Sequence, residues 1–192
     1  MKLFKIALLI LSLQLQVSCK VQQPKINGVS FVASRDTITD KHITPVVNVN
    51  ANYAAIMPFG FIRDTTHPEI IYNSKRQWYG ESKVGVKQYI EALKKRQVKI
   101  MMKPQIWISR GEFTGFLKMT NETKWKILED SYTGFILAYA QLAQETQAEI
   151  FCIGTELEQF VINRPEYWNQ LIVKIKDIYK GKLTYAANWD EF

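Results

Sequence analysis

The chain has 192 residues, of which 47% are hydrophobic and 22% are charged, and its formal net charge is +7 at pH 7. A disordered protein would carry fewer apolar and aromatic residues, so this composition indicates a folded globular domain, or part of a larger one. The positive charge does not indicate a nucleic-acid-binding protein, because the lysines are spread along the chain and its densest basic run, residues 94–96, closes an amphipathic helix without any RNA- or DNA-binding motif.

The first residues have the pattern of a secretory signal. Lys2 and Lys5 precede and flank the apolar run IALLILSL at 6–13, and the small residues of QLQVSC follow. The apolar run is too short to cross a bilayer, which needs about 20 residues. We therefore expect the protein to be exported.

Cys19 ends this segment, and residues 14–19 resemble the lipobox of bacterial lipoproteins, whose cysteine becomes the acylated N-terminus. Gln16 departs from that motif, which usually has leucine there. We expect residues 1–18 to be a lipoprotein-type signal peptide, Cys19 to be the lipidated first mature residue and 19–25 to be a short tether on the periplasmic or cell-surface side of a membrane. The alternative is an ordinary cleaved signal in which Cys19 has no role.

The other cysteine, Cys152, lies in the apolar stretch FCIG and is interpreted as a small buried side chain. A disulfide framework is therefore not expected. The two histidines belong to no cluster of metal-ligand residues, and no GxGxxG follows the first strand. We expect neither a metal nor a cofactor.

Strand and helix patterns alternate after residue 25. The expected strands are 26–34, 52–62, 98–108, 149–156 and 183–189, and a polar loop at 63–69 ends the second. The segment 43–51 is expected to be a short connection that is helical after Pro45. The main helices are expected at 82–97, capped by Ser82, from Thr120 onward, and at 164–182, with Pro165 in its first turn.

This alternation predicts βαβ units and a parallel sheet. Two architectures remain open. An open doubly wound sheet could be completed by five βα steps, whereas a (β/α)8 barrel usually needs about 250 residues and would be represented here by its first five units.

The strand ends carry the residues of greatest interest, because chemistry in parallel α/β folds lies at the carboxyl ends of the strands. They combine aromatic rings, amides and carboxylates, a mixture that suits a sugar, since sugar rings have apolar faces and hydroxyl rims. The candidate site residues are Glu156 as the catalytic residue and Trp78, Lys103, Gln105, Trp107, Asn188 and Trp189 as substrate-binding residues.

Glu156 follows a strand in which alternation would place Cys152, Gly154 and Glu156 on one face, with the two small residues inside a barrel and Glu156 at its mouth. Glycoside cleavage needs such a carboxyl group and a second one. The structural alternatives are a strand-end carboxylate that is solvated or paired with a lysine, and tryptophans that pack under a loop.

The chain resembles glycoside hydrolase family 113, the β-mannanase family of a clan of (β/α)8-barrel enzymes. The matching stretches are NANYAAIMP, QWYGES, KIMMKPQIWI, GEFTGF, FCIGTELE and LTYAANWDEF, which occur in family order and cover most of 26–192. The resemblance implies a retaining β-1,4-mannanase-like hydrolase of β-mannan or manno-oligosaccharides, with Glu156 as general acid/base. Thr155 departs from the wider clan, which usually has asparagine before this glutamate.

The clan's nucleophile is a glutamate at the end of strand seven, and this sequence ends after strand five. We do not assign that role to Asp190 or Glu191. We expect residues 26–192 to be the N-terminal part of a catalytic domain whose nucleophile lies outside the chain. The rival hypotheses are a non-catalytic carbohydrate-binding lipoprotein and a structural α/β lipoprotein.

Overall fold

A five-stranded parallel sheet organises the protein. The computed structural model describes residues 25–64 and 66–191, so the predicted signal peptide, Cys19 and most of the tether lie outside the described residues. The sheet has the order β1-β2-β5-β7-β8. Its strands are β1 (Gly28–Phe31), β2 (Tyr53–Ile56), β5 (Lys99–Met102), β7 (Ile150–Thr155) and β8 (Lys182–Ala186).

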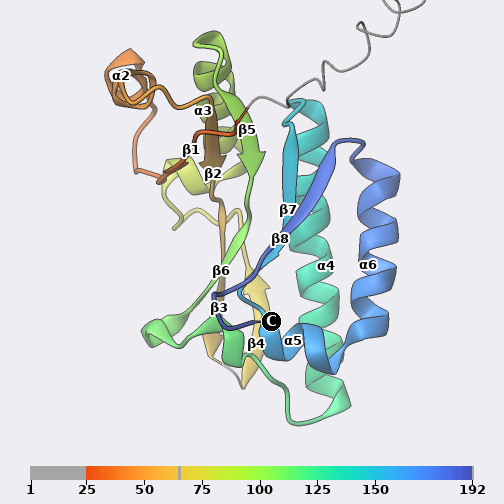
Figure 1. Cartoon of the computed structure of the whole chain (residues 1–192). Helices are drawn as coiled ribbons and strands as arrows, with labels where there is room; N and C mark the ends of the chain where they lie inside the picture. Colours follow the sequence, from red (N-terminus) through yellow and green to blue (C-terminus); the bar gives the residue numbers. More distant parts are fainter. Residues whose placement is uncertain (1–24, 65, 192) are drawn as a thin grey trace, which may run out of the picture.

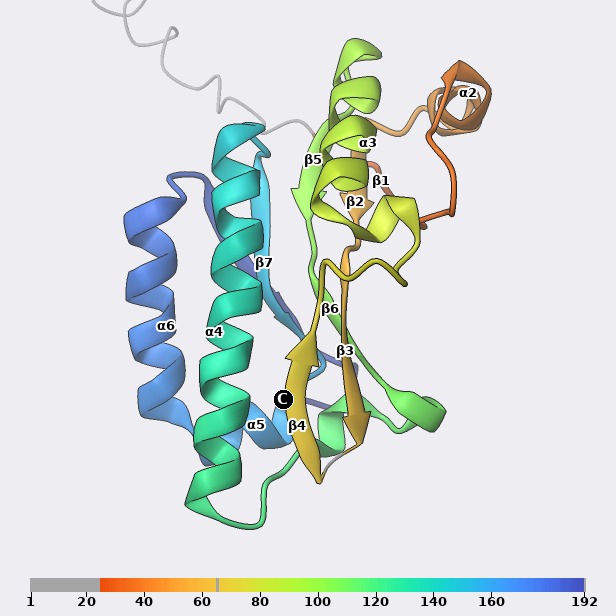
Figure 2. The same ribbon diagram turned by 180° about the vertical axis from the view of Figure 1, so that it is seen from behind.

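The helices that connect these strands lie on one face of the sheet. Figures 1 and 2 show α3 (Lys83–Lys95), α4 (Glu122–Glu145) and α6 (Pro165–Ile178) gathered on that face, while α2 (Asp40–Asn48) lies to the side. A doubly wound sheet would carry helices on both faces and reverse its strand order. Here the parallel strands lie side by side in the order in which they follow along the chain, with the helices on one face, which is the arrangement of a (β/α)8 barrel.

Local sequence explains where these helices begin. The Ser82 hydroxyl accepts a hydrogen bond from the Gly85 N–H at 3.2 Å, which confirms the predicted cap of α3. Asn121 caps α4 in the same way, through the Lys124 N–H at 2.9 Å. Pro165 opens α6, where its missing N–H costs no helical bond.

The core lies between these helices and the sheet. Helical spacing predicts three apolar stripes, and the core contains Val86, Tyr89, Ile90 and Leu93 of α3, Trp125, Leu128, Tyr132, Phe135, Tyr139 and Leu142 of α4, and Trp168, Leu171 and Ile175 of α6. Ile172 and Ile178, also predicted for the stripe of α6, are only partly buried and pack against this core. None of the helices in the described part of the chain is long and apolar enough to cross a membrane.

The prediction of single strands at 52–62 and 98–108 was wrong, because each is interrupted. A second sheet of order β4-β3-β6 continues beyond the ends of β2 and β5, and consists of β3 (Phe59–Asp64), β4 (His67–Ile71) and β6 (Gln105–Ile108). The pairings of β2 with β5 and of β3 with β6 have the same offset, which places Pro58 level with Pro104. Prolines have no N–H to donate to a ladder, so the sheet divides at this level.

The prediction of a polar loop at 63–69 was wrong for most of its length, because 63–64 belong to β3 and 67–69 belong to β4, which pairs with β3 in antiparallel fashion. Burial accounts for the difference: Ile70 is 5% exposed and its N–H donates to the Ser131 hydroxyl of α4 at 2.7 Å. This anchorage to α4 makes the second half of the segment a strand.

Other boundaries differ from the prediction as well, among them those of β1, which spans Gly28–Phe31 instead of 26–34. The helix α2 begins at Asp40, before Pro45, because the buried side chains of Ile43 and Val46 hold it on both sides of the proline. An additional helix, α5 (Glu158–Asn163), follows β7 directly, and the short 3-10 helices are η1 (Tyr79–Glu81), η2 (Ser109–Gly111) and η3 (Thr114–Phe116). Finally, β8 ends at Ala186 instead of continuing to 189.

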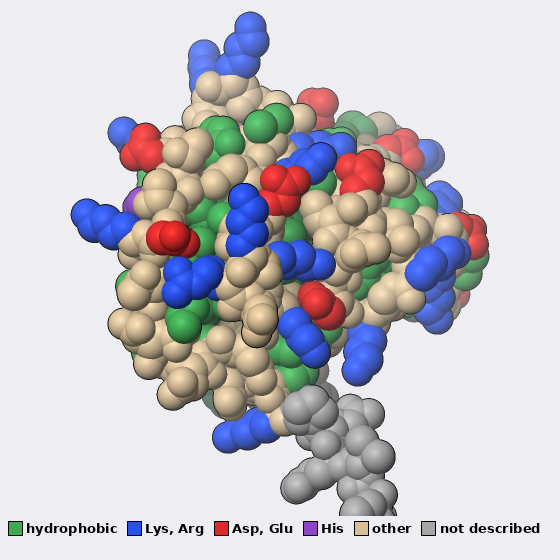
Figure 3. All heavy atoms as spheres, turned by 90° about the horizontal axis from the view of Figure 1, so that it is seen from above, with side chains coloured by type: hydrophobic (Ala, Val, Ile, Leu, Met, Phe, Trp, Pro, Cys, Tyr) green, Lys and Arg blue, Asp and Glu red, His purple; other side chains and the backbone are tan. Residues whose placement is uncertain are grey.

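The surface charge is dispersed on the face seen from above in Figure 3. Lysine and arginine side chains lie among acidic and hydrophobic ones there, and do not gather in a single patch.

Candidate active site

Two adjoining cavities lie at the carboxyl ends of the strands. The first, of about 360 Å³, is called the Glu156 cavity and is lined by Phe59, Lys103, Gln105, Ile106, Trp107, Ile108, Gly111, Glu112, Phe113, Thr114, Thr155 and Glu156. The second, of about 550 Å³, is called the Glu81 cavity and is lined by Val32, Ala33, Phe59, Phe61, Ile71, Ser74, Arg76, Gln77, Trp78, Glu81 and Trp107. Phe59 and Trp107 belong to both, so the two cavities share a wall.

Glu156 follows the last residue of β7 and has a left-handed backbone, with φ of 50°. Its N–H donates to the Ala186 carbonyl at 2.9 Å, which ties this turn to the end of β8. The side chain is partly buried. In the stretches 25–64 and 66–191 no ion pair joins Glu156 to a lysine, so nothing there supports the lysine-paired alternative.

The route by which Glu156 reaches the cavity differs from the one predicted. Simple alternation of Cys152, Gly154 and Glu156 on an inner face is wrong, because the pairing of β7 with β8 shifts register between Cys152 and Thr155. A Cβ on Gly154 would meet the Trp168 and Tyr185 rings at 2.9 Å, so this glycine faces α6. The irregular step and the left-handed turn together direct Glu156 to the cavity.

Lys103, Gln105 and Trp107 line the Glu156 cavity beside Glu156, as the common position at strand ends predicted. Lys103 lies in the break between β5 and β6, and the other two lie on β6. Trp107 is 51% exposed, which leaves much of its indole surface open to a ligand. The pairing of β6 with β3 places Phe59 opposite Gln105, and this brings the Phe59 ring into the same wall.

Trp78 lies in the Glu81 cavity and not in the Glu156 cavity. The Arg35 guanidinium lies 5.3 Å from the centre of its ring, a cation–π contact that covers one face of the indole. The backbone N–H of Trp78 donates to Glu81 Oε2 at 3.1 Å. Trp78 is 43% exposed.

Asn188 and Trp189 line neither cavity, because β8 ends at Ala186 and the chain turns after it. The Asn188 side-chain amide donates to Asp190 Oδ1 at 2.8 Å, and Trp189 is 82% exposed. The structure therefore brings four of the seven predicted residues into the Glu156 cavity and a fifth, Trp78, into the adjoining Glu81 cavity. The substrate contacts assigned to Asn188 and Trp189 stay a prediction.

Sequence reasoning missed Phe59, Phe61, Glu81 and Phe113 as cavity residues. The alternation in PFGF offered a signal for the two phenylalanines, since it places both rings on one side of a strand that follows a proline. Glu81 lies in the family-like stretch QWYGES, but its place in the cavity depends on the packing of η1. Within the described ranges, no three His, Cys, Asp or Glu side chains are grouped so that they could hold a metal ion.

The fold and the two cavities show which class of protein this is. It is a barrel-type α/β protein with a site at the carboxyl ends of its parallel strands, lined by aromatic rings and carboxylates. The chain matches the model of Glycoside Hydrolase Family 113 over residues 32–191, and it belongs to that family. The resemblance inferred from the sequence is thereby confirmed. None of the curated proteins matches the chain.

Solved structures confirm the fold class. The GH113 β-mannanase AaManA from Alicyclobacillus acidocaldarius, in complex with ManMIm, superposes with a TM-score of 0.77 at 22% identity, over 88% of this chain and 56% of that one. A complex of a GH113 β-1,4-mannanase gives 0.75 at 18% identity, over 86% and 56%. The chain thus spans a little over half the length of these proteins and has the fold of part of a (β/α)8 barrel.

Proposed function

We propose that this chain is the N-terminal part of a retaining β-1,4-mannanase-like glycoside hydrolase that acts on β-mannan or manno-oligosaccharides. The observation that carries the proposal is the position of Glu156, a partly buried carboxylate in a cavity walled by the Trp107 and Phe59 rings and by the polar side chains of Lys103 and Gln105. Family membership and the β-mannanases among the similar structures support the substrate class.

In the proposed mechanism Glu156 is the general acid/base. It donates its proton to the glycosidic oxygen while the bond from that oxygen to the anomeric carbon breaks, and a carboxylate outside this chain forms the new bond to the anomeric carbon. Glu156, now a carboxylate, then removes a proton from the water that attacks this intermediate and releases the sugar. Retention of configuration requires the two carboxyl groups to lie about 5 Å apart. Trp107 stacks on an apolar sugar face, and Lys103 and Gln105 bind hydroxyl groups.

The substitution Glu156→Ala tests this role in the full natural protein. Hydrolysis of manno-oligosaccharides should fall by about 10²- to 10⁴-fold, because these poor leaving groups need protonation. Aryl mannosides, whose leaving groups need little protonation, should retain far more of the first step, and added azide should restore turnover and yield a β-glycosyl azide.

Glu158→Ala is the matched control, since Glu158 begins α5 two residues later and lines neither proposed cavity. A threefold or smaller loss of oligosaccharide hydrolysis in Glu156→Ala, far below the range given for acid catalysis, would remove Glu156 from the mechanism. A wild-type protein that binds these sugars without cleaving them would favour the non-catalytic carbohydrate-binding lipoprotein.

We further propose that the protein is exported and anchored to a membrane through acylated Cys19. The support is the sequence pattern alone, in which basic, apolar and small residues lead to this cysteine. Metabolic labelling with a fatty-acid probe in the native host should tag the wild type and not Cys19→Ala. Equal labelling of both proteins, or labelling of neither, would refute the anchor.

A further inference from the structure

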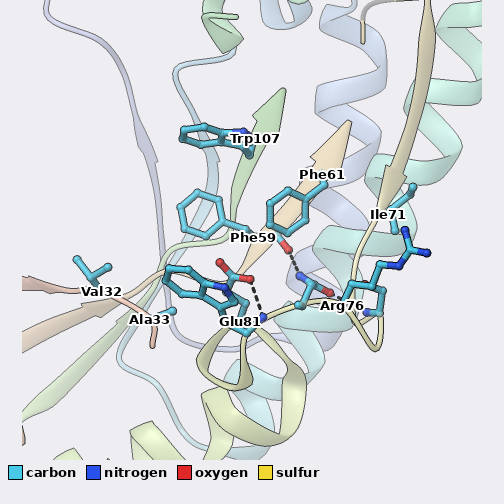
Figure 4. A pocket seen from close by; sticks show the side chains of 11 residues that line it. Val32, Ala33, Phe59, Phe61, Ile71, Arg76, Glu81 and Trp107 are labelled. Atoms are coloured by element: carbon cyan, nitrogen blue, oxygen red, sulfur yellow. Dashed lines mark hydrogen bonds between the residues drawn. The ribbon is translucent and has the colours of Figure 1, made fainter. Parts of the chain in front are cut away.

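The Glu81 cavity combines an apolar wall with a single carboxylate. Figure 4 shows the Trp107, Phe59 and Phe61 rings together on one side of it and the Glu81 carboxylate directed toward them from below. The centres of the Phe59 and Phe61 rings are 6.3 Å apart, and Val32, Ala33 and Ile71 extend the apolar lining. An aromatic wall facing a polar group is the arrangement that binds amphipathic rings such as sugars.

Both polar ends of Gln77, which also lines this cavity, already make a hydrogen bond to the backbone. Gln77 accepts from the Ser74 N–H and donates to the Phe59 carbonyl, both at 2.7 Å, so its amide fixes the loop before η1 to β3. The Gln77 amide thus serves to hold the backbone around the cavity.

Glu81 differs from Gln77 in this respect. Its Oε2 accepts the Trp78 N–H at 3.1 Å, and among the described residues no hydrogen bond or ion pair reaches its Oε1. Burial raises the pKa of this carboxyl group, and the Trp78 N–H opposes that shift. The cost of holding a partly buried carboxylate beside aromatic rings is reduced when its second oxygen also accepts a hydrogen bond.

We propose that the Glu81 cavity is a second sugar subsite, separate from the cavity of Glu156, in which Glu81 Oε1 accepts a hydroxyl of one sugar unit while the apolar face of that unit contacts the aromatic wall. The proposal rests on the proposed glycan substrate. Because Phe59 and Trp107 border both cavities, one oligosaccharide chain can occupy the Glu156 cavity and extend across Trp107 into this subsite.

Glu81 also has a structural role, since it closes the turn of η1 through the Trp78 N–H. Glu81→Gln separates the two roles. The glutamine carbonyl can still accept the Trp78 N–H, whereas its NH₂ replaces the oxygen that would accept the sugar hydroxyl. A structural role alone therefore predicts an unchanged affinity, and a subsite predicts a weaker one. Glu91→Gln is the matched control, because Glu91 is exposed on α3 and lines neither cavity.

The experiment uses the full natural protein, with mannohexaose as the long ligand and an aryl β-mannoside as a ligand too short to reach both cavities. We expect Glu81→Gln to raise both the KM for mannohexaose and its Kd, measured by tryptophan fluorescence, about tenfold, the usual effect of one hydrogen bond to a charged group. The kcat/KM for the aryl mannoside and the melting temperature should match those of Glu91→Gln.

The outcomes distinguish this inference from the proposed function. A wild type that cleaves mannohexaose, with Glu81→Gln within twofold of it in KM and Kd, would overturn the subsite and leave the function standing. Equal losses on both substrates would overturn the separation of the two cavities. A wild type that binds mannohexaose tenfold more tightly than Glu81→Gln without cleaving it would uphold the subsite and overturn the hydrolase. A wild type that neither binds nor cleaves it would overturn both.

Discussion

Glu156 shows how a single backbone angle determines what a side chain can do. A left-handed conformation costs a non-glycine residue about 1–2 kcal/mol, and such strain is concentrated at functional sites. At Glu156, with φ of 50°, the conformation is held by the bond from its N–H to Ala186 and directs the carboxylate to the cavity. The residue type and its place after a strand were predictable from FCIGTELE. The shifted register was not, because it depends on the packing of Gly154 against Trp168.

The irregular step of β7 also depends on Tyr132. The Tyr132 hydroxyl donates to the Ile153 carbonyl at 2.7 Å, and both groups are buried between α4 and the sheet. Removing a buried donor leaves its acceptor unsatisfied, at a cost of about 1–3 kcal/mol. We therefore expect Tyr132→Phe to lower the free energy of unfolding by about this amount, measured by urea denaturation of the full natural protein.

Tyr72→Phe provides the comparison for this variant. Tyr72 packs against Phe135 at a ring distance of 5.4 Å, and no hydrogen bond involves its hydroxyl in the part of the chain that the structure describes. Its replacement removes a similar oxygen without leaving a buried acceptor. Equal losses in the two variants would show that the bond to Ile153 contributes nothing specific.

At the scale of elements, the helices were predictable and the divided strands were not. Helical spacing of apolar residues is a local signal, so the buried stripes of α3, α4 and α6 could be identified before any packing was known. The second sheet depends on which residues face each other across strands. Pro58 and Pro104 were visible in the sequence, but only the shared register shows that they lie at one level and divide the sheet there.

That division positions one wall of the candidate site. The pieces beyond the prolines, β3 and β6, carry Phe59, Phe61, Gln105 and Trp107, all of which line the two cavities. The hairpin partner β4 fixes β3 to α4 through Ile70 and Ser131. Lys103, Gln105 and Trp107 could be placed at strand ends from the sequence, and they line one cavity with Glu156. The end of β8 could not, because it depends on the pairing with β7, and Asn188 and Trp189 lie beyond that end.

At the scale of the whole molecule, the two end strands of the five-stranded sheet, β1 and β8, are less buried than the inner strand β7. The first five residues of the six in β7 are buried, whereas β8 is only partly buried and β1 alternates between exposed and partly buried residues. Both end strands are paired along one side in the described structure. In a barrel each would have a second neighbour, and the inner face would be covered by the other strands.

We accordingly expect residues 20–192, expressed alone, to unfold with weak cooperativity. Two open sheet edges and a partly uncovered inner face leave β1 and β8 with fewer hydrogen bonds and less buried apolar area than β5 and β7. Urea denaturation followed by circular dichroism should give a broad transition, and amide hydrogen exchange should be faster in β1 and β8 than in β5 and β7. The full natural protein is the control, and its exchange should be slow in all four strands because a closed barrel has no edge. A sharp two-state transition of the shorter protein, at a monomeric mass and with uniformly slow exchange, would instead show that these βα units form a stable open sheet by themselves.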